Sequence, residues 1–135
     1  MPPPVTPLLT ADCVVVDPDR GVLMVRRKNT PFKGDLALPG GFVDVGETVE
    51  TAAKRELMEE TGIKATNLTL VGVYSEPDRD PRGHVCSVAF LVQTKNEVAE
   101  AGDDAEAVAW IKNFDGIAIA FDHRKIITDA LNLIR

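Results

Sequence analysis

The segment from Gly41 to Ile63, GFVDVGETVETAAKRELMEETGI, restricts the fold more than any other part of the chain. Thr48 has a side chain suited to cap the N-terminus of a helix, and Gly62 can adopt the left-handed conformation that ends one. Between them, apolar residues recur at helical spacing, at Val49, Ala53 and Leu57. The segment therefore predicts a helix from Thr48 to just before Gly62, with one face packed against a core.

Three acidic side chains share one face of this predicted helix, because they lie at positions i, i+3 and i+4: Glu56, Glu59 and Glu60. Glu56 and Glu60 are like charges one turn apart, which costs an isolated helix about 0.2–0.5 kcal/mol. All three lie in the C-terminal half, where the helix dipole disfavours anions. Glu60 also continues the apolar stripe. A single acid would fit a solvated helix face, but the group predicts a hard divalent cation, Mg²⁺ or alternatively Mn²⁺.

The rest of the chain is dominated by predicted strands, with a second helix at its end. The strands are expected at residues 8–17, 22–26, 68–75, 84–94 and 108–112, with short extended pieces in residues 36–43 around the break at Pro39-Gly40-Gly41. Asp122 is the expected N-cap of the final helix, whose inner face would be formed by Ile126, Ile127, Ala130, Leu131 and Ile134. This order predicts one α/β domain over residues 1–135, with layers packed on a mixed sheet.

Charge and composition limit the classes of function. The formal net charge of −6 argues against nucleic-acid binding through a basic face. No apolar run approaches the roughly 20 residues needed to span a membrane, and the N-terminal segment lacks the regions of a signal peptide. Cys13 and Cys86 lie in apolar runs without a partner motif, so we expect buried free thiols and a cytoplasmic protein.

Basic residues gather in two short segments of this acidic chain. The loop YSEPDRDPRGH, residues 74–84, contains Arg79, Arg82 and His84, and the second strand ends in Arg26, Arg27 and Lys28. Such a local patch can receive phosphate oxygens, although a solvated turn with internal ion pairs explains the loop equally well.

The helical segment resembles the motif of the Nudix family. Gly41 is followed after five residues by Glu47 and after seven more by Arg55-Glu56-Leu57, then by Glu59-Glu60 and Gly62-Ile63 at the family's spacing. This resemblance implies a Nudix-type α/β/α sandwich with a mixed β-sheet and hydrolysis of a nucleoside diphosphate linked to another group, with Mg²⁺ or Mn²⁺.

The resemblance also implies roles for individual residues. Glu56, Glu59 and Glu60 would bind metal, together with a backbone oxygen of Gly41 or its neighbour Gly40. Glu47 would assist catalysis, and Arg55 would hold the glutamates in register. Glu59 would be both a metal ligand and a catalytic residue. Glu106 is the expected general base, and Glu100, Asp103 and Asp104 are alternatives to it.

The loop at residues 74–84 is similar to the ADP-ribose pyrophosphatase branch of the family. On this basis we expect ADP-ribose to give AMP and ribose 5-phosphate, with Arg27, Arg79, Arg82 and His84 binding the substrate. Phe32 would stack on adenine, whereas Phe90 is expected in the core. Two alternatives stay open: a pyrophosphohydrolase of altered nucleoside triphosphates, and a non-catalytic ligand sensor. The resemblance also favours a homodimer.

Overall fold

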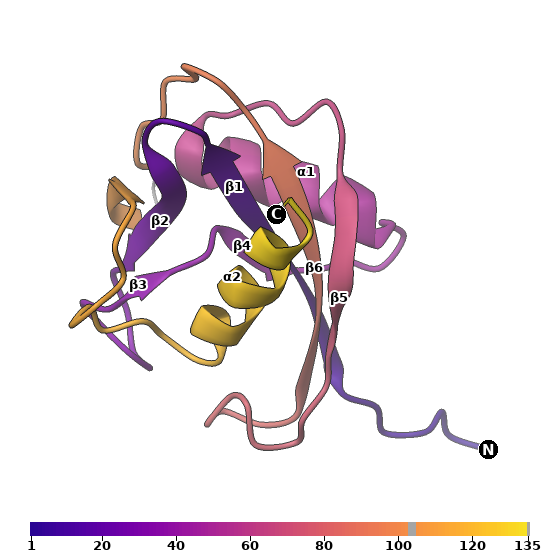
Figure 1. The fold of residues 1–135 in the computed structure, drawn as a ribbon. Coiled ribbons are helices and arrows are strands. Elements are labelled where there is room, and N and C mark those ends of the chain that lie inside the picture. Colours follow the sequence, from indigo (N-terminus) through magenta and orange to yellow (C-terminus); the bar gives the residue numbers. More distant parts are fainter. Residues whose placement is uncertain (103–104, 135) are drawn as a thin grey trace.

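A computed structural model describes residues 1–102 and 105–134, and its centre is the strand β1, Leu8–Asp17. This strand pairs with several other strands, and the first seven residues extend away from the body of the molecule (Figure 1). Within the described residues, seven strands form one sheet in the order β3-β2-β1-β6-β5, with β4 on β1 and β7 on β2. The other strands are β2 Gly21–Arg27, β3 Leu36–Ala37, β4 Gly40–Phe42, β5 Thr69–Tyr74, β6 Val85–Gln93 and β7 Ala105–Ile111.

The sheet is mixed, as predicted. β1 runs parallel to β6 in an unbroken register from Leu8 opposite Val85 to Val16 opposite Gln93, whereas the other named strand pairs are antiparallel. β1 and β2 form the expected hairpin. Its turn is held by Asp17, which accepts hydrogen bonds from the backbone of Asp19 and Arg20 and from the Arg20 guanidinium.

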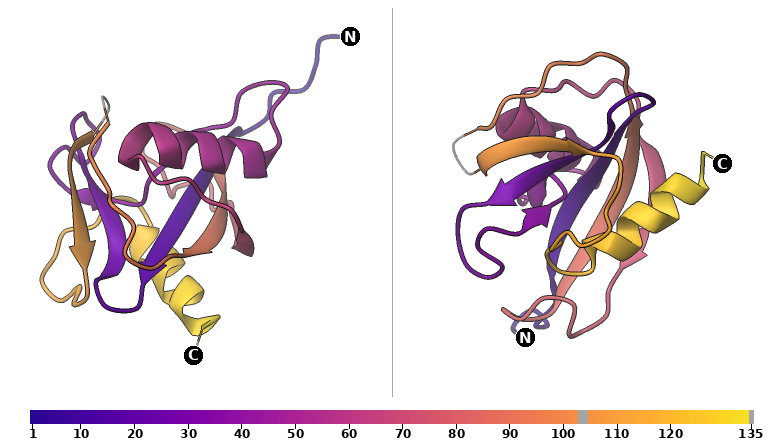
Figure 2. Two further views of the ribbon diagram at one scale, coloured as in Figure 1. Left: turned by 90° about the horizontal axis from the view of Figure 1, so that it is seen from above. Right: turned by 60° about the vertical axis from the view of Figure 1, so that its left-hand side comes forward.

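Two helices cover opposite faces of the sheet (Figure 2), which confirms the α/β/α architecture. Alternate side chains of β1 point to opposite faces, as strand geometry requires. Ala11, Cys13 and Val15 pack with helix α1, Val49–Thr61, and Val14 packs with helix α2, His123–Asn132. The apolar run of β1 is therefore buried on both sides.

Helix α1 has the predicted caps. The side chain of Thr48 accepts a hydrogen bond from the backbone N–H of Thr51, and Gly62 ends the helix at φ 75°. Leu57 is fully buried. Local sequence signals therefore determine both ends of the helix that carries the glutamates.

The predicted N-cap position of α2 is confirmed, but the side chain there does not cap the helix. Asp122 occupies the N-cap position, but its side chain makes no capping hydrogen bond. Both of its carboxylate oxygens instead accept hydrogen bonds from Arg79, at 2.7 and 2.9 Å. A long-range ion pair has taken the place of the local cap.

Some strand limits and one burial prediction also differ. β7 begins at Ala105 rather than at residue 108, because it pairs with β2 as far as Arg27. Cys13 and Cys86 are free thiols, but Cys86 is only half-buried. Phe90 lies in the core, as expected. Among the described residues, no helix has the length and apolar character needed to cross a membrane.

Candidate active site

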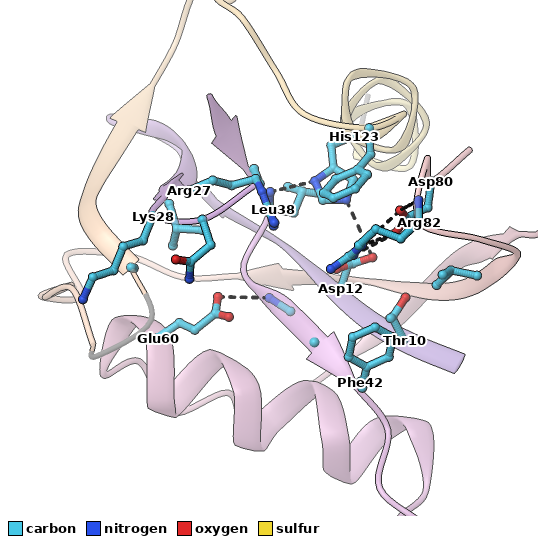
Figure 3. Close-up of a pocket in the computed structure, with 18 of the residues that line it drawn as sticks. Thr10, Asp12, Arg27, Lys28, Leu38, Phe42, Glu60, Asp80, Arg82 and His123 are labelled. Atoms are coloured by element: carbon cyan, nitrogen blue, oxygen red, sulfur yellow. Dashed lines mark hydrogen bonds and ion pairs between the residues drawn. The ribbon is translucent and has the colours of Figure 1, made fainter. Parts of the chain in front are cut away.

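A pocket of about 220 Å³ opens where one end of the sheet meets α1, α2 and the loop between β5 and β6 (Figure 3). It contains the side chain of Glu60 and the backbone of Gly40 and Gly41. Cationic side chains from two separate segments also line it: Arg26, Arg27, Lys28, Arg79 and Arg82. The structure therefore brings the two predicted basic segments to one cavity.

The glutamate face of α1 lies against β4. Glu60 accepts a hydrogen bond from the backbone N–H of Gly40 at 3.2 Å (Figure 3). Glu56 packs so closely on Gly41 that a Cβ added there would meet its carboxylate atoms at 2.5–2.7 Å. Glycine at position 41 allows the Glu56 carboxylate to lie there, because a side chain at position 41 would need the same space.

Arg55 connects the acids of the helix to the loop before it. Its guanidinium binds Glu47 through two hydrogen bonds of 2.8 and 2.9 Å, and Glu56 through one of 2.8 Å. The expected contact with Glu59 is present but longer, at 3.3 Å. The Arg55 guanidinium also donates a hydrogen bond to the carbonyl oxygen of Phe42. Hydrogen bonding to Glu47, followed by that to Glu56, raises the pKa of Arg55, and the same contact lowers the pKa of Glu47 to about 2.

The β1–β4 register distinguishes the two glycine carbonyls. Directly opposite residues of an antiparallel pair alternate between hydrogen-bonded and non-hydrogen-bonded types. Cys13 donates to Pro39, and two residues before Cys13, Ala11 lies opposite Gly41 in the same alternation. The polar groups of Gly41 therefore face β1, whereas those of Gly40 face Glu60. The register favours Gly40 over Gly41 as the source of an open backbone oxygen.

The donor atoms at this edge suit a magnesium ion that is only partly coordinated by protein. Within residues 1–102 and 105–134, no three His, Cys, Asp or Glu side chains converge as a complete ligand set. The Glu59 side chain is 57% exposed and interacts with Arg55, so the expected group of three is not preassembled. Mg²⁺ is commonly held by one or two carboxylates together with water and substrate phosphate. Glu56, Glu60 and a backbone oxygen fit that pattern.

Arg27 and Arg82 approach the same aromatic ring from two directions. Their guanidinium carbons lie 5.0 and 5.6 Å from the ring centre of Phe121, which has an unusual φ of 54° for a bulky residue. Burial, reinforced by the charge of Arg82, lowers the pKa of Arg27. Two neighbouring cations in a partly buried pocket favour an anionic ligand between them.

The remaining predicted cations are already engaged. Arg79 is only 5% exposed and forms the ion pair with Asp122, so its main contact is structural. Arg82 binds Asp80 through both carboxylate oxygens, with a shortest contact of 2.7 Å. Burial alone would raise the pKa of Asp80, but the hydrogen bonds from Arg82 outweigh it and lower that pKa. The loop at residues 74–84 thus contains an internal ion pair, as expected for a solvated turn. Arg82 nevertheless lines the pocket.

Two predicted substrate contacts lie elsewhere. His84 is exposed, and its Nε2 lies 2.9 Å from the carbonyl oxygen of Ser75. Phe32 packs edge-on against Phe121, with ring centres 4.8 Å apart. Neither residue lines the pocket. Phe32 nevertheless packs on a residue of the pocket lining, Phe121, and His84 lies beside pocket residues in the sequence.

The structure describes the side chains of only some of the residues proposed as general base. Asp103 and Asp104 lie outside the described residues, and Glu106 is described only as a backbone position in β7. Glu100 belongs to the segment after β6. Its backbone N–H donates a hydrogen bond to the carbonyl oxygen of Thr61 at the end of α1. This contact brings the acidic segment to the helix end that also bears Glu60.

Sequence reasoning missed Asp12 and His123, which line the pocket on the α2 side of the sheet. Both are buried, and His123 Nε2 lies 3.9 Å from Asp12 Oδ2. The available signal was a lone acid within the apolar β1 run, because an acid in a strand buried on both faces must meet a partner or a ligand.

The chain is similar to known proteins in sequence and in fold. A family model described as NUDIX domain matches residues 6–129. A protein named ADP-ribose pyrophosphatase from Methanocaldococcus jannaschii is 50% identical over 115 residues, which are 85% of this chain and 68% of that protein. A MutT/nudix family protein from Enterococcus faecalis superposes with a TM-score of 0.93 at 34% identity, over 99% of this chain and 64% of the other. The NUDIX domain of Shewanella oneidensis NrtR, crystallised with ADP ribose, superposes with a TM-score of 0.90 at 29% identity, over 97% and 90% of the two chains.

Proposed function

The chain belongs to the Nudix family, and from this we propose that it hydrolyses ADP-ribose to AMP and ribose 5-phosphate. One observation carries the proposal: a glutamate and the Gly40–Gly41 backbone lie at one end of a pocket that is otherwise rich in arginine. A diphosphate requires both features, metal ligands beside it and cations around it. The relatives named for ADP-ribose support this choice of substrate.

We propose that Mg²⁺, or alternatively Mn²⁺, is held by Glu56, Glu60 and the backbone at Gly40, with Glu59 as a further ligand. Bound there, the ion would polarise phosphoryl oxygens and lower the pKa of a coordinated water. Gly41 keeps space for the Glu56 carboxylate, and Arg55 holds that carboxylate in place from its other side. The chain thus positions these oxygens through backbone packing and one arginine.

The other residues of the pocket bind and orient the substrate in this proposal. Arg27 and Arg82 would receive phosphate oxygens, because their guanidinium groups converge around Phe121. Glu47 holds Arg55 and so acts at one remove from the glutamates. Glu106 would accept a proton from the attacking water, a role that its family position suggests.

A hydrolysis screen tests the activity directly. ADP-ribose, dinucleotides, other nucleoside diphosphate sugars and nucleoside triphosphates would be incubated with the protein and Mg²⁺, and the products identified by chromatography. We expect AMP and ribose 5-phosphate from ADP-ribose as the preferred reaction. Release of pyrophosphate from a nucleoside triphosphate at a higher kcat/KM would identify the sanitising alternative.

The same screen separates catalysis from sensing. A ligand sensor would bind ADP-ribose without consuming it, and the NUDIX domain of NrtR forms such a complex with ADP ribose in its crystal structure. We also propose a homodimer and a cytoplasmic location, the latter supported by two free thiols. Light scattering on a sizing column would measure the mass in solution, and a monomer would contradict the proposed dimer.

A further inference from the structure

Asp12 is a buried carboxylate in the pocket whose position is explained by neither the glutamate helix nor the arginines. It is 6% exposed, and it lines the cavity from β1 (Figure 3). The hydroxyl of Ser87 donates a hydrogen bond to Asp12 Oδ2. Among the described residues this is the hydrogen bond that the carboxylate accepts, and it ends on Oδ2. Oδ1 therefore keeps acceptor capacity for a ligand.

His123 is fixed in a neutral form beside Asp12. The backbone N–H of Leu38 donates to His123 Nδ1 at 3.0 Å, so this nitrogen carries no hydrogen. In a neutral ring the hydrogen is then on Nε2, which faces Asp12 Oδ2 at 3.9 Å. Burial lowers the pKa of His123, which agrees with a neutral ring. The hydrogen bond from Ser87 therefore holds the Asp12 carboxylate, and the His123 ring lies beside it.

Asp12 and Glu60 lie on opposite sides of Gly40. Asp12 is directly across from Gly40 in the β1–β4 pair, and Oδ1 packs so closely on Gly40 that a side chain there would collide with it. The backbone N–H of Gly40 points the other way, to Glu60. Because Asp12, Gly40 and Glu60 line one cavity, a group attached to a diphosphate at Glu60 and Gly40 can reach Asp12.

We propose that Asp12 is a specificity-determining residue that accepts hydrogen bonds from the hydroxyl groups of the terminal ribose, the one that carries no adenine, and disfavours a third phosphate in that position. The inference rests on the proposed function and names the part of the substrate that is recognised. Ser87 and His123 are positioning residues for Asp12.

A carboxylate attracts ribose hydroxyls and repels a phosphate. Ribose hydroxyls donate hydrogen bonds, which a carboxylate accepts strongly because it is charged. A phosphate offers oxygen acceptors and negative charge, so it leaves the carboxylate unpaired and repels it. Arg79 does not cancel this effect by contact, because its Nε and Nη2 bind Asp122 and its Nη1 donates to the carbonyl oxygen of Val85.

The test compares Asp12→Asn with the wild type in two measurements: kcat/KM for ADP-ribose, and the inhibition constant of ATP against that reaction. We expect kcat/KM to fall about 10-fold and ATP to inhibit about threefold more tightly, because the amide is uncharged. Asp17→Asn is the matched control, since Asp17 is buried in the β1–β2 hairpin and hydrogen-bonded within that turn. It should leave the relative preference unchanged. Ser87→Ala should shift the preference in the same direction as Asp12→Asn by a smaller factor.

A second measurement needs no variant of Asp12. Analogues of ADP-ribose that lack one hydroxyl on the terminal ribose should lose about 10-fold or more in kcat/KM with the wild-type protein. In Asp12→Asn that loss should shrink. A loss confined to analogues altered in the adenosine ribose would contradict the proposal. Equal use of all the analogues by the wild type, or a parallel weakening of ADP-ribose and ATP in Asp12→Asn, would overturn the role of Asp12. A wild-type protein that does not hydrolyse ADP-ribose would instead refute the proposed function on which it rests.

Discussion

Replacing Gly41 with alanine would move a carboxylate without removing any polar group. The added Cβ would lie 2.5–2.7 Å from three atoms of the Glu56 carboxyl group, whereas ordinary contact begins near 3.4 Å. Glu56 must therefore retreat by roughly 0.7–0.9 Å. The φ angle of Gly41 is not positive, so alanine fits the backbone, and the displaced group is the flexible end of a side chain. The fold should survive while the carboxylate is misplaced.

The expected loss of activity follows from that displacement. Misplacing a catalytic group by about 1 Å can lower the rate by about 100-fold, equivalent to ~2.7 kcal/mol in the barrier. We expect Gly41→Ala to lower kcat/KM for ADP-ribose by about this factor and to raise the Mg²⁺ concentration for half-maximal rate. Thermal melting would show that the protein remains folded.

Gly72→Ala is the matched control for this experiment. Its added Cβ would meet only the ring of Tyr74, at 3.6 Å or more, which is ordinary contact on β5 away from the glutamates. We expect activity close to that of the wild type. If folded Gly41→Ala also kept its activity within about threefold and its Mg²⁺ dependence unchanged, the reasoning that Glu56 must lie against Gly41 would be refuted.

Four further predictions concern the acids and the loop arginine. Glu60→Gln should keep the melting temperature but lose about 100-fold or more in kcat, because a metal ligand is removed; near-wild-type turnover would contradict it. Glu106→Gln should lower kcat by ~10²-fold if this residue is the general base, whereas a loss below about threefold would point to a neighbour. Arg82→Ala should raise KM for ADP-ribose more than it lowers kcat, and an unchanged KM would leave the loop with a structural role alone. The pKa of Glu47 is lowered to about 2 from 4.5, so its ionised form stabilises the fold above pH 4.5 and that contribution disappears as the pH falls towards 2. The difference in melting temperature between wild type and Glu47→Gln should follow this course, and a difference independent of pH would exclude the explanation.

Features determined by neighbouring residues could be predicted from the sequence. Thr48 and Gly62 define α1 through hydrogen bonds and backbone angles within a few residues, and both predictions are confirmed. The hairpin of β1 and β2 follows in the same way from a short polar turn. The layered α/β class with a mixed sheet was predictable from the order of strand and helix patterns, whereas the α/β/α arrangement was implied by the resemblance to the Nudix family.

Features that depend on distant partners could not be predicted in this way. Asp122 has the composition and position of a cap, yet Arg79, 43 residues away in sequence, binds its carboxylate. The packing of Phe32 on Phe121 joins residues 89 positions apart in the sequence, so no local pattern predicts it. The contact of Asp12 with His123 requires the sheet register and the docking of α2 together, and no single segment encodes both.

The parallel pairing of β1 with β6 has a consequence for how the protein folds. The two strands meet over nine consecutive residue pairs, from Leu8 opposite Val85 to Val16 opposite Gln93, although most of the chain separates them in sequence. Closing so long a loop costs entropy before any strand contact compensates for it, so such pairings form slowly. Helix α1 can nucleate early from its own caps, but Asp12 on β1 meets Ser87 on β6 only after this closure. During refolding the helical signal should therefore recover before the catalytic activity, and the delay between them would measure the time the chain takes to pair β1 with β6.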